Sequence, residues 1–203
     1  RLFWCVYSLD RQICSYFGRP FGIPEESITT RYPSLLDDSF ITLTNREIDD
    51  YSDLPSPNPS SKVIALAMYK IRRIQASIVR ILYAPGAELP RRFMDLESWR
   101  IETYNELERW FQVDVPKNFE MMNCKFNSIW FDLNYHYSKS ILYGLSPKFP
   151  TLNDTAFKIV LDSTKGTIDV FYNLCVNKKI GYTWVAVHNM FMTGMTYLYV
   201  NFY

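Results

Sequence analysis

The chain has 203 residues, and their composition limits what the protein can be. Hydrophobic residues make up 48% and aromatic residues 17%, which is ample for a sizeable core in a single domain. The formal net charge is only +1, so the bulk of the chain lacks the excess of lysine and arginine that a DNA-gripping surface needs.

The cysteines and histidines form no recognisable metal site. Cysteines stand at positions 5, 14, 124 and 175 without a paired spacing, and His136 and His188 lie far apart. We therefore expect no metal ligand in this chain, and reduced, buried thiols of an intracellular protein. Both ends look cut from a longer polypeptide, because the chain starts without methionine and stops inside an aromatic helical pattern.

The first 61 residues predict one helix followed by irregular structure. Residues 1–17 contain no helix breaker and end at Gly18, a common C-terminal signal. Residues 18–33 are rich in glycine and proline, so an ordered irregular segment is expected there. Residues 42–61 are polar, acidic and rich in proline, which predicts a flexible surface loop.

Five more helices are predicted after that loop. One should run from the Ser60–Ser61 cap to about 84, and the others should cover about 89–112, 123–143, 151–179 and 182–203. Thr151 or Asn153 should cap the fourth of these five. The prediction is an all-α fold, a multi-helix bundle of five to six main helices.

The helix predicted at 60–84 has one apolar stripe with basic residues beside it. The stripe follows alternating steps of four and three, and the basic side chains are read as its solvated side rather than as a phosphate site. The stripe residues are Ala67, Ile71, Ile74, Ile78 and Ile81, and the flanking residues are Lys70, Arg72, Arg73 and Arg80.

Residues 180–203 carry no Asp, Glu, Lys or Arg. Their length could span a bilayer, but several Asn and Thr side chains would then need partners in hydrocarbon. We expect a helix that is buried on all sides in a soluble bundle. Its methionines and aromatic residues also indicate a pocket for an apolar effector, formed by Trp184, His188, Met192 and Tyr197.

One acidic run could bind magnesium. Asp49–Asp53 has the spacing DDxxD, which all-α isoprenoid synthases use on a rigid helix to hold magnesium and a diphosphate. Here the run lies in a segment rich in proline and serine, without a second acidic motif, so a solvated loop is the preferred interpretation. No nucleophile elbow or phosphate-binding glycine loop is present either, and we predict no catalytic residue.

The charges in the first helix need another explanation. If Phe3, Val6, Tyr7, Ile13, Cys14 and Phe17 pack inward, Asp10 or Arg11 must lie near the buried boundary. A buried guanidinium needs a carboxylate or carbonyl groups, and the following segment offers free carbonyls together with Glu25–Glu26. We predict that Asp10, Arg11 and Arg19 form a structural lock.

Three short motifs in this region resemble a known family. Residues 1–4 read RLFW, 9–11 read LDR and 18–23 read GRPFGI, in the order and spacing of the fungal-specific transcription factor domain. That domain is the middle homology region of fungal zinc binuclear cluster (two-zinc, six-cysteine) regulators. Later segments agree along nearly the whole chain, although residues 144–147 read GLSP and lack the arginine that is usual at that turn.

The resemblance implies that residues 1–203 are a single regulatory domain of a nuclear, sequence-specific regulator of RNA polymerase II transcription, and not an enzyme. It implies no cofactor in this chain, zinc in an N-terminal cluster outside it, and DNA contact only through that cluster. It implies several partners: coactivators or repressors, a second subunit in a homodimer or heterodimer, and a small apolar or xenobiotic effector. It implies no association with a membrane. A structural or dimerisation module, and more remotely an all-α magnesium enzyme, remain the alternatives.

Overall fold

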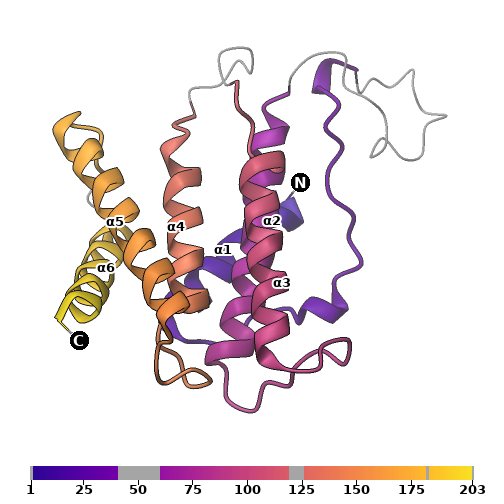
Figure 1. The fold of residues 1–203 in the computed structure, drawn as a ribbon. Coiled ribbons are helices and arrows are strands. Elements are labelled where there is room, and N and C mark those ends of the chain that lie inside the picture. The colour runs from indigo at the N-terminus through magenta and orange to yellow at the C-terminus, as the bar shows by residue number, and fades with distance from the viewer. Residues whose placement is uncertain (1, 41–59, 119–125, 182, 203) are drawn as a thin grey trace. The chain divides into compact units, whose positions relative to one another are not determined.

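The computed structural model describes residues 2–40, 60–118, 126–181 and 183–202, and these ranges contain helices and no β-strand (Figure 1). The all-α prediction is therefore confirmed. Two 3-10 turns and one π-helical turn complete the described elements. The α-helices are α1 (Leu2–Phe17), α2 (Lys62–Tyr83), α3 (Leu96–Arg109), α4 (Ile129–Tyr143), α5 (Asp154–Val176) and α6 (Trp184–Phe202).

Capping residues stand at the starts of the helices, and the sequence predicts only some of them. Asn153 caps α5, because its side chain accepts a hydrogen bond from the Ala156 amide at 2.8 Å. The start predicted at 89 was wrong, and α3 begins at Leu96. Asp95 and Ser98 cap that start reciprocally: Asp95 Oδ1 accepts from the Ser98 amide at 2.7 Å, and Ser98 Oγ accepts from the Asp95 amide at 3.4 Å.

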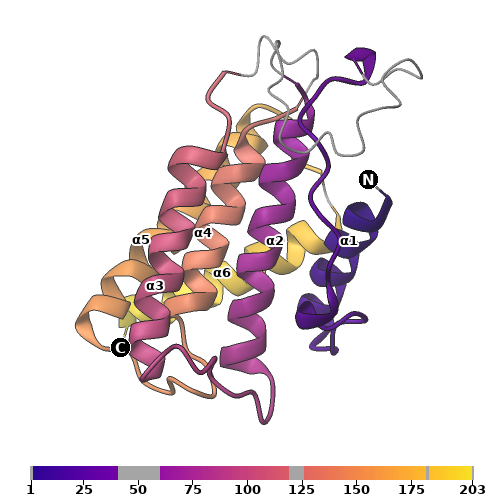
Figure 2. The same ribbon diagram turned by 90° about the vertical axis from the view of Figure 1, so that its right-hand side faces the viewer.

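The described residues fall into two compact units. The first comprises residues 1–76 and 108–126, and its centre is aromatic. Trp4 stacks on Tyr32 and on Tyr69 of α2, with ring centroids 4.4 and 5.8 Å apart. Trp4 Nε1 also donates to the Arg31 carbonyl at 2.8 Å. In Figure 2 the irregular segment that follows α1 runs alongside α1 and α2. The contacts of Trp4 with Arg31 and Tyr32 hold the segment in this position.

The inward face of α1 differs from the expected one. Its buried residues are Trp4, Tyr7 and Arg11, one face at steps of three and four. Val6, Ile13 and Phe17 were expected inside but are 53–61% exposed. The buried residues are those whose polar atoms find partners inside the unit, since the Trp4 indole, the Tyr7 hydroxyl and the Arg11 guanidinium all form hydrogen bonds.

The predicted stripe of α2 is confirmed, because all five of its residues are buried. One flanking residue departs from the expectation of a solvated basic side. Arg72 is only 8% exposed, and it donates to the Gln75 side-chain oxygen at 2.6 Å. A polar neighbour one turn away satisfies part of its guanidinium, so burial of this arginine becomes tolerable.

The second unit comprises residues 77–107 and 127–203, and α5 packs against both α4 and α6 in it (Figure 1). One core cluster contains Leu133, Phe171, Leu174 and Ala186. The His136 ring of α4 lies on Gly166 of α5, where a Cβ atom would overlap the ring. Burial first, and then the positive charge of Lys139, lower the pKa of His136, while Asp169 acts in the opposite direction.

The prediction that α6 is buried on all sides was wrong. Ala186 and Val200 are its buried residues, and most of its large apolar side chains are substantially exposed. Among the helices that the structure describes, none has the length and apolarity needed to cross a bilayer. The expectation of buried thiols also fails at two positions, since Cys5 and Cys175 are free and exposed. Cys124 lies outside the described residues.

Candidate functional site

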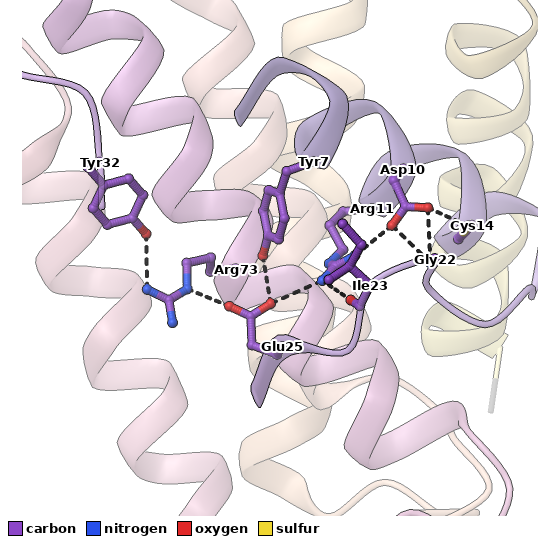
Figure 3. A network of polar contacts seen from close by, with 9 residues as sticks. All are labelled: Tyr7, Asp10, Arg11, Cys14, Gly22, Ile23, Glu25, Tyr32 and Arg73. Atoms are coloured by element: carbon purple, nitrogen blue, oxygen red, sulfur yellow. Dashed lines mark hydrogen bonds and ion pairs between the residues drawn. The ribbon is translucent and has the colours of Figure 1, made fainter. Parts of the chain in front are cut away.

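A polar network at the motif-bearing N-terminal segment is the candidate functional site (Figure 3). Its centre is Arg11, which α1 places on the buried face and which is only 2% exposed. The guanidinium carbon lies 4.3 Å from the centroid of the Tyr7 ring and 4.6 Å from that of the Phe21 ring. Arg11 is thus held between an aromatic ring of its own helix and one of the following segment, in cation–π geometry.

The polar contacts of Arg11 join the same two pieces of chain. One terminal nitrogen donates to Asp10 Oδ2 at 2.5 Å, and the other donates to the Ile23 carbonyl at 2.6 Å. The second nitrogen also lies 3.3 Å from Glu25 Oε2. Its Nε is buried without a hydrogen-bond partner among the described residues. Arg11 therefore uses one terminal nitrogen to anchor the segment after the helix and the other to pair with Asp10.

Asp10 holds the turn of that segment directly. Its carboxylate oxygens accept from the Gly22 amide at 3.1 and 3.3 Å. A Cβ atom at position 22 would stand 3.0 Å from Asp10 Oδ1, so glycine allows this close approach. Cys14 Sγ donates to the same carboxylate at 3.5 Å, and burial first, then Asp10, raise the pKa of the Cys14 thiol.

Glu25 extends the network from α1 to α2. Its carboxylate accepts from the Tyr7 hydroxyl at 2.9 Å and from Arg73 Nε at 2.6 Å. Arg73 also donates to the Tyr32 hydroxyl at 3.2 Å. Burial, reinforced by Glu25, raises the pKa of Tyr7. For Arg73, burial alone would lower the pKa, but the contacts with Tyr32 and Glu25 outweigh it, so the pKa of Arg73 is raised. One carboxylate thus gathers donors from two helices.

The predicted lock residues occupy different positions. Asp10 and Arg11 form an ion pair and meet the segment that was expected to receive them, through Ile23 and Glu25. Arg19 has an exposed side chain outside the network; its amide donates to the Cys14 carbonyl at 2.9 Å at the end of α1. Sequence reasoning missed Tyr7 and Arg73 as members. The position of Tyr7 one turn before Arg11 was a usable signal, whereas no local spacing points to Arg73.

Another buried arginine, also missed, lies in the other unit. Arg100 of α3 is 3% exposed, and its guanidinium lies 4.7 Å from the Tyr143 ring centroid and 4.1 Å from that of Phe149. It donates to Glu97 at 2.5 Å on the same helix. The turn at Ser146–Phe149 is thereby held by an arginine between two rings, much as Arg11 is held in the first unit.

The residues of the predicted effector pocket are spread around α6. The rings of Trp184 and His188 stack with centroids 5.1 Å apart and an interplanar angle of 13°. Met192 continues that side of the helix and is 48% exposed. Tyr197 stands thirteen positions after Trp184, which places it on a different side of the helix. The structure therefore brings together Trp184 and His188, with Met192 along the same side.

The described residues give little support to a metal site or to nucleophilic catalysis. Asp49–Asp53 lies outside them. Within the part of the chain that the structure describes, no group of three His, Cys, Asp or Glu side chains could hold a metal ion. His136 has a buried Nδ1 without a partner there, but its ring is packed against α5 rather than aligned with a nucleophile.

Comparisons with known proteins agree with the motifs at the network. The chain is similar to a positive regulator of purine utilization from Emericella nidulans, at 27% identity over 98% of this chain and 22% of that protein. It is 30% identical to an uncharacterised transcriptional regulatory protein of Saccharomyces cerevisiae, over 98% of this chain and 14% of the relative. A regulatory protein of the same description from Schizosaccharomyces pombe is 23% identical, over 98% of this chain and 26% of the relative.

These relatives define a class of fungal proteins that regulate transcription. The model of the fungal-specific transcription factor domain matches residues 1–112, which include α1, the irregular segment and α2. The chain belongs to the fungal-specific transcription factor domain family. It spans only 14–26% of the length of the curated relatives it matches. No solved structure matches it significantly.

Proposed function

We propose that this chain is a regulatory region of a fungal, sequence-specific regulator of RNA polymerase II transcription. The family match over residues 1–112 supports this role most directly, since it covers the motifs that build the polar network. The protein would act in the nucleus, and this chain would carry out no catalysis. Residues 1–203 would act as one regulatory domain, with coactivators or repressors as partners.

DNA recognition and zinc binding would lie outside this chain. Family members of this kind carry a zinc cluster N-terminal to the region, and the described residues here offer no group of metal ligands. The net charge of +1 also gives little electrostatic attraction to phosphate. Regulation, rather than DNA contact, is the task left for the helical region.

The polar network would serve as the structural lock of this region. Asp10 and Arg11 hold the segment at Gly22–Glu25 on α1, and Glu25 connects it to Arg73 of α2. An element held by a few charged contacts can exist in an attached and a released arrangement, which is what a regulatory switch requires. Arg19 would contribute only to ending α1, because its side chain is exposed.

A reporter assay tests the regulatory role. The chain is fused to an unrelated DNA-binding domain and placed upstream of a reporter gene in yeast. Wild-type chain should change reporter output relative to the DNA-binding domain alone, and Glu25→Ala should alter that output at equal protein level. Arg19→Ala serves as the matched control and should behave as wild type. Equal output from the fusion and the bare DNA-binding domain would contradict a regulatory role.

We further propose that a small apolar effector binds beside Trp184, His188 and Met192. The stacked and half-exposed Trp184 ring offers a flat apolar surface, and methionine adapts to varied ligand shapes. Tyr197 would not contact the same ligand, given its place on another side of α6. A ligand that binds only the folded chain must raise the melting temperature.

A thermal-shift screen against lipids and drug-like apolar compounds tests this second proposal. A true effector should stabilise the wild-type chain and lose its effect in Trp184→Ala. Trp130→Ala is the matched control, since Trp130 is a 46% exposed tryptophan on α4. A broad panel without any shift, or shifts that persist in Trp184→Ala, would count against the site while leaving the regulatory role intact.

A further inference from the structure

One face of α6 is apolar and exposed along its whole length. Six large side chains follow one another at steps of three and four, which places them on the same side of a helix. Each is between 51 and 84% exposed, whereas the opposite side contains the buried Ala186 and Val200. We call this set the α6 stripe; it consists of Trp184, Val187, Phe191, Met195, Leu198 and Phe202.

The composition of the α6 stripe is that of an interface core. No charged residue occurs anywhere in residues 180–203, although helices that face water normally carry charges on the exposed side. Aromatic residues and methionine are the types enriched in the centres of protein–protein interfaces, where charges are depleted. An exposed apolar face of this kind marks a surface that binds another molecule.

The size of the face fits a protein rather than a small ligand. Six half-exposed large side chains leave on the order of 600 Å² open, taking roughly 100 Å² for each. Met190 and Met192 on the flanks, 42 and 48% exposed, raise the total toward the roughly 800 Å² per partner of a standard interface. A drug-sized effector would cover only part of that area.

The order of residues along the stripe indicates which protein it fits. The positions of the six stripe residues are nearly symmetric about the midpoint of α6: reversing the direction of the helix brings each position to within one residue of another stripe position. An antiparallel copy would therefore set Trp184 against Phe202, Val187 against Leu198, and Phe191 against Met195. These are an aromatic pair, an aliphatic pair and a sulfur–aromatic pair, each a favourable contact. Mutual pairing of residues i and j is the signature of a two-fold, isologous interface.

We propose that α6 is a homodimer interface, in which the α6 stripes of two copies of this chain pack antiparallel. Because the face carries no charge, it cannot attract a partner through opposite charges. Its area and the near-symmetric positions of its residues fit a second copy of the same helix. Gly194 lies on the flank of the stripe, and a Cβ atom there would meet nothing within 4 Å in the chain. That position is open in the single chain and would face the partner in the dimer.

Light scattering after size-exclusion chromatography of the 203-residue chain tests the proposal. The wild-type chain should show twice the monomer mass at micromolar concentration. Gly194→Glu should shift it to monomer with unchanged helicity by circular dichroism, because the new side chain enters open space in the monomer but adds a buried charge to the dimer. Met94→Glu, at a 98% exposed position on another segment, should leave the dimer intact. A wild-type chain that stays monomeric overturns the proposal and leaves the face to the apolar effector.

Complementary charges test the antiparallel pairing. Phe191→Lys and Met195→Glu should each yield monomers, since either change places one charge in the apolar centre on both copies. Mixing the two variants should restore a dimer, because the antiparallel arrangement sets Lys at 191 of one copy beside Glu at 195 of the other. A mixture that stays monomeric, alongside a dimeric wild type, overturns this arrangement.

Discussion

Replacing Arg11 with alanine removes the centre of the polar network, and its cost can be worked out contact by contact. The hydrogen bond to the Ile23 carbonyl is lost, which costs about 1.5–3 kcal/mol for a charged donor. Contacts with the Tyr7 and Phe21 rings contribute about 0.5–1 kcal/mol each.

The ion pairs add less than in a fully buried site. The Asp10 and Glu25 side chains are 26 and 29% exposed, so water can solvate both carboxylates once Arg11 is gone. Their share is discounted toward the 0–1 kcal/mol of surface pairs. The expected total is about 3 kcal/mol of lost unfolding free energy, at the low end of the roughly 3–5 kcal/mol for breaking a buried pair.

Urea unfolding followed by circular dichroism measures this loss. With a slope of about 2 kcal/mol/M, the midpoint of Arg11→Ala should fall by roughly 1.5 M. Arg19→Ala is the matched control from the same motif and should shift the midpoint by less than about 0.3 M, because its side chain is exposed. A midpoint of Arg11→Ala equal to wild type, or an equal loss in both variants, would refute the reasoning.

Three more predictions concern the second unit. Gly166→Ala should lower the unfolding free energy by about 1–3 kcal/mol in urea titrations, because the new Cβ overlaps the His136 ring; Gly181→Ala, with open space around it, should not. Stability should fall as pH drops below about 6.5, since burial lowers the pKa of His136 and the unfolded chain binds that proton more readily. His136→Asn should flatten this slope in melting curves recorded across pH. Arg100→Ala should cost about 1–2 kcal/mol through its two lost ring contacts and should expose the turn at 146–149 to proteolysis; an unchanged digestion pattern would contradict that role.

The helices could be predicted from sequence because their signals are local. Caps such as Asn153 act within three residues, and the isoleucine stripe of α2 repeats within one element. The choice of the inward face of α1 was not local. Two sides of α1 carry large side chains at helical spacing. The side with Val6, Ile13 and Phe17 is exposed, whereas the side with Trp4 and Tyr7 is buried. Partners for their polar atoms, at Arg31 and Glu25, lie far along the chain.

The network shows the same boundary between what is predictable and what is not. The need of Arg11 for carbonyl and carboxylate partners follows from charge burial, so the segment after α1 could be named in advance. The contact between Glu25 and Arg73 joins residues 48 positions apart. Nothing in the helical pattern distinguishes Arg73 from its neighbour Arg72, yet one pairs with Glu25 and the other is buried beside Gln75.

The hydrogen bond from the Gly22 amide to Asp10 gives the region a built-in spectroscopic reporter. This amide is held by a side chain of α1 rather than by a helical ladder, so its hydrogen exchanges with solvent from states in which its bond to Asp10 is broken. Its exchange rate therefore measures the free energy of releasing the segment, even when the released form is too rare to see directly. Any effector, partner or substitution that acts on the lock can be ranked by this single resonance.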